Sequence, residues 1–126
     1  MEMNQLSGEI VAAAIEVHRE LGGPGLLESV YEEALVEELR IRGLSLERQL
    51  AVEVAYKGKN LATPLRLDLL VENSVIVEIK AVAELSTVSR SQLLTYLRMA
   101  DKSLGLLINF GEPLVKNGIH RVVNQL

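Results

Sequence analysis

Apolar and polar residues recur with a helical period over the first third of the chain. Residues ~7–21 carry apolar side chains three and four positions apart, with charged residues on the opposite face. The apolar positions are Ile10, Ala13, Ala14, Val17 and Leu21. A second stretch of this kind runs from ~Leu26 to ~Arg42, after Gly22-Gly23-Pro24-Gly25, a sequence that breaks a helix. The pattern therefore predicts two amphipathic helices.

The period becomes that of a β-strand in the middle of the chain. Val52, Val54 and Tyr56 take every second position, which predicts a first strand. Residues 57–60, Lys-Gly-Lys-Asn, have the composition of a hairpin turn. Two further strands are predicted at ~Leu61–Glu72 and at Val75–Val82.

The last third of the chain predicts a helix and two more strands. Ser86–Ala100 has helical spacing, and Leu104–Phe110 is a nearly continuous apolar run, typical of a strand buried on both faces. Ile119–Val123 is a short last strand. Hairpin strands followed by a helix and a buried strand predict an α/β fold with a mixed sheet flanked by helices. The 126 residues suffice for one domain, 1–126, and are too few for two independent cores.

Three charged residues, Asp68, Glu78 and Lys80, interrupt the second and third strands. The odd-numbered positions of both strands are aliphatic, and successive strand side chains point to opposite faces. If both aliphatic faces point to one core, the three charged residues share the other face. A three-residue loop at 72–74 would place Asp68 directly across from Glu78, with β-carbons about 5 Å apart. A two-residue loop would set Asp68 against Ile79 and break the pattern unless a bulge intervened.

Two carboxylates at that distance repel each other unless a cation lies between them. Mg²⁺ prefers one or two carboxylates, with water and substrate phosphate as the remaining ligands. Lys80 could then orient the attacking water or neutralise charge in the transition state. From these three residues alone, a solvated face is the favoured interpretation, because any hairpin with one solvated face shows acids and lysines at every second position.

Composition and charge narrow the function classes. The absence of cysteine excludes disulfides, thiolate metal sites and a cysteine nucleophile. The apolar runs are far shorter than the ~20 residues of a membrane helix, and no signal segment opens the chain, so we expect a cytoplasmic protein without membrane contact. Aromatic residues, at 3%, are too few for a stacking platform for single-stranded nucleic acid. The net charge of −4 gives no support for tight non-specific binding to nucleic acid, but residues 44–126 carry eight acids and ten bases, which leaves room for a local basic surface there.

Six short segments form a set that is more specific than the strand pattern alone. The first is Gly25-Leu26-Leu27-Glu28-Ser29-Val30-Tyr31. The others are His18–Gly22, Arg66–Glu72, Val77–Ala81, Gln92–Leu97 and Gly105–Gly111. Together they resemble the GxxExxY proteins, a family assigned to the PD-(D/E)xK nuclease superfamily. The resemblance covers nearly the whole chain and implies a restriction-endonuclease-like αβββαβ core, with an extra N-terminal helix and a short C-terminal strand.

This resemblance implies roles for the charged residues. Asp68 and Glu78 would bind the metal, and Lys80 would position or activate the attacking water. Glu28 would be an additional acid from the core helix that assists Asp68 and Glu78 in holding the metal. The implied cofactor is Mg²⁺, for which Mn²⁺ can substitute. The chain departs from the superfamily pattern in having Leu67 in place of the proline before the aspartate, a position that is no metal ligand.

The later helix carries further candidates. Gln92 and Tyr96 match a Q-x-x-x-Y pattern that exonuclease-like members place near the site, and they lie one turn apart on one helix face. Arg90, Arg98 and Lys102 recur at spacings of eight and four, so they could meet phosphate from one face of the same helix. Charged helix surfaces are more often simply solvated.

Three residues of the matching segments also have structural interpretations. Glu28 lies in the first turn of its helix, where an acid favours the helix dipole. Tyr31 lies within the apolar stripe, so we expect it to pack in the core. His18 is expected to be a surface or hydrogen-bonded packing residue rather than a base.

These observations together predict a Mg²⁺-dependent nuclease that hydrolyses phosphodiester bonds in nucleic acid, with DNA preferred over RNA as the expected substrate. The alternative is a catalytically silent binding or assembly module that keeps the nuclease fold and acts with a partner protein or as a homodimer. Metal binding and cleavage discriminate between the two.

Overall fold

The computed structural model describes residues 1–125 of the 126. The helices are α1 (Met3–Glu20), α2 (Glu28–Ile41), α3 (Val88–Ala100) and the short 3-10 helix η1 (Val115–Gly118). The strands are β1 (Leu46–Val52), β2 (Ala55–Tyr56), β3 (Lys59–Asn60), β4 (Leu65–Val71), β5 (Val75–Lys80), β6 (Leu104–Asn109) and β7 (Ile119–Val123). All three predicted helices and four of the five predicted strands are confirmed to within a few residues.

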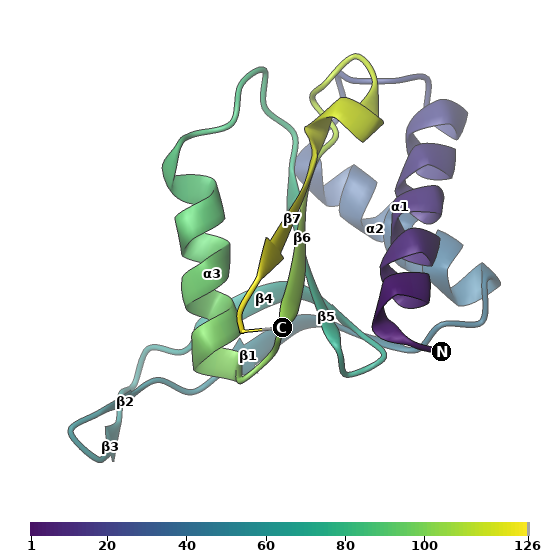
Figure 1. Cartoon of the computed structure of the whole chain (residues 1–126). Helices are drawn as coiled ribbons and strands as arrows, with labels where there is room; N and C mark the ends of the chain where they lie inside the picture. Colours follow the sequence, from purple (N-terminus) through teal and green to yellow (C-terminus); the bar gives the residue numbers. More distant parts are fainter. Residues whose placement is uncertain (126) are drawn as a thin grey trace.

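Five strands form a mixed sheet in the order β1-β4-β5-β6-β7. β5 and β6 are parallel and are joined through α3, whereas the other neighbouring strands are antiparallel. Figure 1 shows α1 and α2 on one side of the sheet and α3 on the other. The predicted α/β class, with its mixed sheet, extra N-terminal helix and C-terminal strand, is therefore confirmed.

The sheet has a separate core on each face. Under α1 and α2 the strands contribute Leu69, Val71, Val75, Val77, Ile79, Leu104, Leu106 and Ile108. Under α3 the core contains Leu67, Leu70, Ile76, Leu93, Leu97 and Leu107. Because the aromatic content is low, aliphatic side chains fill nearly all of both cores.

The placement of Leu67 corrects one prediction. The alternation pattern put Leu67 on the same face as Leu69, but Leu67 packs under α3 together with Leu70. Two residues three positions apart cannot share a face of a regular strand, so the alternation of β4 is broken beside Asp68. The break lies opposite Gln49 of β1, which interrupts the β1–β4 ladder with a φ of 53°.

The first predicted strand, at residues 52–56, is also wrong. The strand that pairs with β4 is β1, and β2 belongs to a separate two-stranded sheet with β3. β1 lies at the sheet edge and none of its residues is buried, so it shows no apolar alternation that the sequence could reveal. The predicted turn is present, with Lys57 and Gly58 at φ values of 50° and 80°.

Within residues 1–125, no helix has both the length and the apolar character needed to cross a membrane.

Candidate functional site

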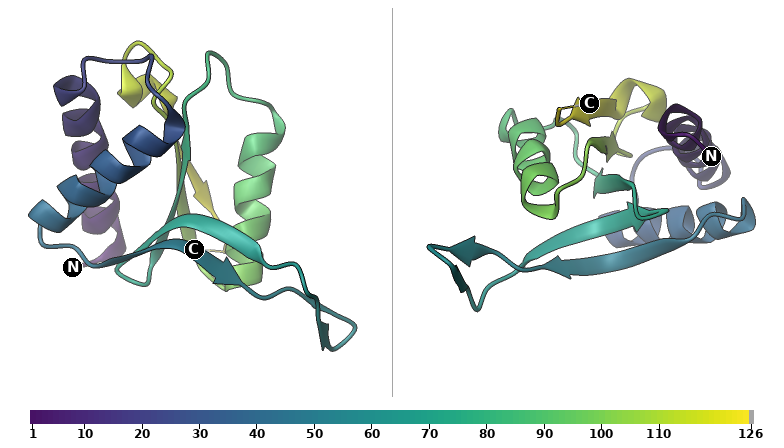
Figure 2. Two further views of the ribbon diagram at one scale, coloured as in Figure 1. Left: turned by 180° about the vertical axis from the view of Figure 1, so that it is seen from behind. Right: turned by 60° about the horizontal axis from the view of Figure 1, so that its bottom comes forward.

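The ladder between β4 and β5 stops part of the way along both strands. Its pairs are Val71–Val75, Leu70–Ile76 and Leu69–Val77. The loop is therefore the predicted three-residue loop at 72–74, and the next opposed positions are Asp68 and Glu78. Figure 2 shows β1 and β4 turning away from β5 beyond this point. We call this divergence of β4 from β5, at Asp68 and Glu78, the fork.

Side chains replace the missing ladder at the fork. The backbone N–H of Asp68 donates to Oε2 of Glu78 at 2.8 Å, and the backbone N–H of Ile79 donates to Oδ2 of Asp68 at 2.8 Å. Each carboxylate therefore satisfies an amide that the opposite strand leaves unpaired. Glu78 is only 8% exposed, so the interpretation of this face as simply solvated is wrong. The face is covered because α3 packs against it through Leu93 and Leu97.

Burial and repulsion disfavour the charged forms of this pair. Burial, followed by the charge of Asp68, raises the pKa of Glu78 from its usual 4.5 to about 8. The pKa of Asp68 is raised as well, chiefly by burial, although the bond from the Ile79 N–H opposes the rise. Lys80 lowers the pKa of both carboxyls without reversing either shift. The positive charge of Lys80 is therefore too little to offset the burial and repulsion of the two carboxyls.

α2 brings two more acids towards the fork. Glu28, in the first turn, is exposed, and burial and then the charge of Asp68 raise its pKa, whereas Lys80 lowers it. Glu32, one turn later, is only 7% exposed and binds two residues of β1. Its Oε2 accepts from Nε of Arg48 at 2.7 Å, and its Oε1 accepts from Nε2 of Gln49 at 2.9 Å.

Gln49 connects Glu32 with the acid pair. Its Nε2 also donates to Oδ1 of Asp68, at 3.3 Å. Gln49 lies between two paired positions of the β1–β4 ladder and has left-handed backbone geometry, with a φ of 53°. The register of the ladder is the same on both sides of Gln49, so this residue leaves the strand pairing without an inserted residue.

Sequence reasoning missed Glu32, Arg48 and Gln49. A polar run on an edge strand carries no signal that separates a site residue from a solvated one. Glu32 did carry one signal, because it lies four residues after Glu28 and therefore on the same helix face.

The segment after Lys80 is fixed by a buried amide. Asn109, which is opposite Lys80 in the β5–β6 ladder, is fully buried. Its Oδ1 accepts from the N–H groups of Val82 and Gly111, both at 3.0 Å, and its Nδ2 donates to the Val82 carbonyl at 2.9 Å. Gly111 approaches so closely that a β-carbon there would lie 2.1 Å from the Val82 oxygen. Asn109 thus holds the chain two residues beyond Lys80.

Of the two predicted residues on α3, Tyr96 approaches the acid pair. Its pKa is raised by burial and then by the charges of Glu78 and Asp68, and its ring packs against the core under α3. Gln92 lies one turn earlier on the same helix and is exposed.

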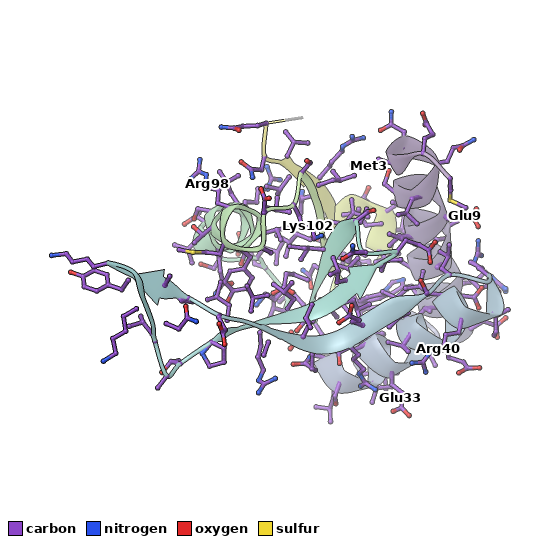
Figure 3. All side chains as sticks on the ribbon, turned by 90° about the horizontal axis from the view of Figure 1, so that it is seen from below. Met3, Glu9, Glu33, Arg40, Arg98 and Lys102 are labelled. Carbon is purple, nitrogen blue, oxygen red and sulfur yellow. The ribbon has the colours of Figure 1, made fainter. Side chains whose placement is uncertain are left out.

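The three bases expected to meet phosphate do not share a helix face. Arg90 lies in the first turn of α3, 2.6 Å from Nδ1 of His120 through its Nη2, and Arg98 lies about 12 Å further along the axis. Lys102 lies beyond the helix, because Asp101 adopts a φ of 55° and ends it. Lys102 instead donates to Asn73 Oδ1 at 3.2 Å. The helix-face prediction is therefore wrong for Lys102, which Figure 3 shows with Arg98 near the end of α3.

Tyr31, the last residue of the Gly25–Tyr31 segment, has a packing role. Its ring is fully buried and stacks on Phe110 with centroids 4.7 Å apart. Its hydroxyl donates to the Gly23 carbonyl at 2.7 Å and accepts from the Leu26 N–H at 3.2 Å. His18 is buried with its Nε2 3.1 Å from the Phe110 carbonyl oxygen. Core packing of Tyr31 and the hydrogen-bonded packing role of His18 are confirmed, and together they fix the turn that precedes α2.

The fork offers two carboxylates rather than three to a cation. Among residues 1–125, no three histidine, aspartate or glutamate side chains form a group ready to hold a metal ion, so Glu28 does not complete one. Two adjacent carboxylates that leave most ligand positions to water and phosphate oxygens match the preference of Mg²⁺. A cation beside Asp68 and Glu78 would also favour the charged carboxylates, offsetting the burial and then the repulsion from Asp68 that raise the pKa of Glu78. The donor set therefore fits a divalent ion.

Comparisons with known proteins agree with the fold. The crystal structure of SSO0001 is similar with a TM-score of 0.59 and 18% sequence identity, over 78% of this chain and 50% of that one. The chain thus spans about half the length of SSO0001, and the likeness concerns the fold. A search of curated proteins gave no match. A family model described as the PD-(D/E)XK nuclease superfamily matches residues 4–122. Because this match covers nearly the whole chain, the protein belongs to the PD-(D/E)XK nuclease superfamily.

Proposed function

We propose that this protein is a Mg²⁺-dependent nuclease of the GxxExxY family that hydrolyses phosphodiester bonds in DNA. The observation that carries the proposal is the fork, where the half-buried Asp68 and the buried Glu78 lie side by side, with Lys80 two residues further along β5. Membership of the nuclease superfamily supports a nucleic-acid substrate and a divalent metal.

In this proposal Asp68 and Glu78 hold the ion, and Glu28 contributes from α2 as a further acid. Bound Mg²⁺, for which Mn²⁺ can substitute, would supply a water molecule of lowered pKa and charge stabilisation for the phosphoryl oxygens. Lys80 orients that water and offsets negative charge in the transition state. Gln92 and Tyr96 line the site from α3.

A cleavage assay tests the proposal. Purified protein is incubated with single- and double-stranded DNA and RNA in Mg²⁺, Mn²⁺ or EDTA. We expect cleavage with either metal and none with EDTA, and a loss of about 100-fold or more in Glu78→Gln and Lys80→Ala, because each removes a group that acts in the transition state. Glu84→Gln, at an exposed acid beyond β5, is the matched control and keeps its activity. A wild-type protein that cleaves none of these substrates with either metal refutes the proposal.

The catalytically silent module has one observation in its favour. Both carboxylates already bond backbone amides, so a structural role alone accounts for their position. In that case the chain would act by binding a partner protein or a second copy. Calorimetry with Mg²⁺ separates the two functions. Binding that is lost in Asp68→Asn favours the nuclease, and no binding, or binding unchanged in that variant, favours the silent module.

Three expectations stay predictions of the sequence: a cytoplasmic location, action as one domain over 1–126, and phosphate contacts by Arg90, Arg98 and Lys102.

A further inference from the structure

Residues 53–64, which we call the arm, leave the sheet between β1 and β4 and form a projecting hairpin. Its strands β2 and β3 pair with each other, and Lys57 and Gly58 form the tip. Figures 1 and 2 show the arm extending away from the sheet and the helices that cover its two faces. All of its residues except Val54 and Pro64 are exposed.

The arm and its base are basic, although the chain as a whole is acidic. Residues 53–66 contain one acid, Glu53, and three bases, Lys57, Lys59 and Arg66, which gives a net charge of +2 in a chain of net charge −4. Glu53 accepts a hydrogen bond from Asn60 Nδ2 at 2.7 Å, which ties the acid to the arm's own amide. The lysines lie on either side of Gly58 at the tip.

The arm also carries an exposed aromatic ring. Tyr56 is 61% exposed, and Nζ of Lys57 lies 5.5 Å from its ring centroid. The other aromatic residues are occupied elsewhere, since Tyr31 and Phe110 are fully buried and Tyr96 is half-buried. Ammonium groups bind phosphates, and an aromatic face stacks on bases whatever their sequence.

Stability of the fold does not account for the arm. None of its residues belongs to either core, and an isolated two-stranded hairpin is marginally stable in water. Its position does suggest a use, because β4 leads from the arm at Leu65 to Asp68, about 10 Å away along the strand. A polymer held along the arm is therefore directed towards the fork.

We propose that the arm binds the backbone of a nucleic acid and directs it to the fork; this inference rests on the proposed function. Lys57 and Lys59 bind phosphates, and Tyr56 packs against a base or sugar. A second copy of the chain is a poorer occupant. The arm exposes two large apolar side chains, Tyr56 and Leu61. Their surface area is far below the ~800 Å² that each partner buries in a stable interface.

Binding of a short, labelled DNA oligonucleotide, single- or double-stranded, tests the proposal by fluorescence anisotropy over a range of salt concentrations. EDTA is present throughout, so that cleavage cannot occur. We expect Lys57→Ala/Lys59→Ala to weaken binding about tenfold or more at 0.1 M salt and to reduce the salt slope by about two units, one for each lost phosphate contact. Tyr56→Ala weakens binding with the slope unchanged, because it removes stacking and no charge.

The matched control is Arg40→Ala/Lys116→Ala, which removes the same charge elsewhere and leaves affinity unchanged. Arg40 lies on α2, on the side of the molecule away from the arm in Figure 3, and Lys116 lies in η1. A second variant replaces residues 53–64 by Asn-Gly, which joins Val52 to Leu65, already paired in the ladder, through a two-residue turn. It keeps the melting temperature of the wild type and binds as weakly as the double lysine variant.

Three results overturn the proposal: a wild type that binds no oligonucleotide, a lysine variant that binds as the wild type does, and a wild-type dimer that becomes monomeric in the lysine variant by sedimentation. The last would make the arm an interface between copies. Arm-dependent DNA binding without any metal-dependent cleavage refutes the proposed nuclease and leaves the arm proposal standing. Metal-dependent cleavage together with DNA binding that does not depend on the arm refutes the arm proposal and leaves the proposed nuclease standing.

Discussion

Asp68 and Glu78 each accept a hydrogen bond from the backbone of the other's strand, with N–O distances of 2.8 Å to the amides of Asp68 and Ile79. The bonds appear where the β4–β5 ladder ends, so the carboxylates substitute for backbone carbonyls that have moved apart. The same contacts force two acids together in a shielded place. Their position serves the fold, and their repulsion costs stability unless a proton or a cation is bound.

The first prediction concerns the pH dependence of stability. The pKa of Glu78 is raised to about 8 in the folded protein, above its usual 4.5, so folding favours the protonated form. The resulting stabilisation is fully present below about pH 4.5 and is lost as the pH rises through about 8. Glu78→Gln stays neutral and can still accept the Asp68 N–H. Urea unfolding in EDTA is expected to show a flatter pH profile for the variant and a gain of about 1 kcal/mol or more at pH 8. Parallel profiles for variant and wild type between pH 5 and pH 8 would contradict this.

The second prediction concerns Gln49, whose amide donates to both Glu32 and Asp68. Gln49→Glu replaces this donor by a third carboxylate between two others. We expect a loss of about 1–3 kcal/mol in the free energy of unfolding at pH 8, and a smaller loss at pH 5, where protonation relieves the repulsion. Gln125→Glu, an exposed position near the end of the chain, adds the same charge as a control. Equal losses at both pH values would show that charge is not the cause.

The third prediction concerns Asn109, which bonds two N–H groups and one carbonyl in the segment after Lys80. Asn109→Ala removes the partner of these half-buried groups and is expected to cost about 1–3 kcal/mol. Amide hydrogen exchange at Val82 is expected to accelerate more than exchange in α1. Asn117→Ala, at an exposed position in η1, is the control and changes stability by less than about 0.5 kcal/mol. Unchanged exchange at Val82 would mean that the amide does not hold this segment.

The fourth prediction compares two glycines. A β-carbon on Gly111 would lie 2.1 Å from the Val82 carbonyl oxygen, whereas one on Gly8, within α1, meets nothing within 4 Å. Gly111→Ala is therefore expected to destabilise the protein by about 2 kcal/mol or more, because backbone must move. Gly8→Ala is expected to stabilise it by about 0.5–1 kcal/mol, since alanine loses less entropy in a helix. Thermal unfolding of both variants checks the pair, and a stable Gly111→Ala would show that the approach to Val82 is loose.

Several features of the fold and the site follow from local sequence alone. The helical period places α1, α2 and α3, and the aliphatic odd-numbered positions of β4 and β5 fix which register can bury them. That register, with a three-residue loop, puts Asp68 opposite Glu78 by parity. Tyr31 lies in the core because its helical spacing places it in the apolar stripe of α2.

Other features depend on how distant segments meet. β1 lies at an edge with no buried residue, so its polar sequence gave no sign of the strand or of Gln49 in the site. Lys102 leaves the helix face because one left-handed residue, Asp101, ends α3. The sequence by itself determined the elements and the pairing of the two acids, since period and parity are local properties. Only the tertiary structure decided that α3 shields Glu78, that Glu32 reaches Asp68 through Gln49 and that the arm projects. Each of these depends on how segments far apart in the sequence pack together, which no local pattern encodes.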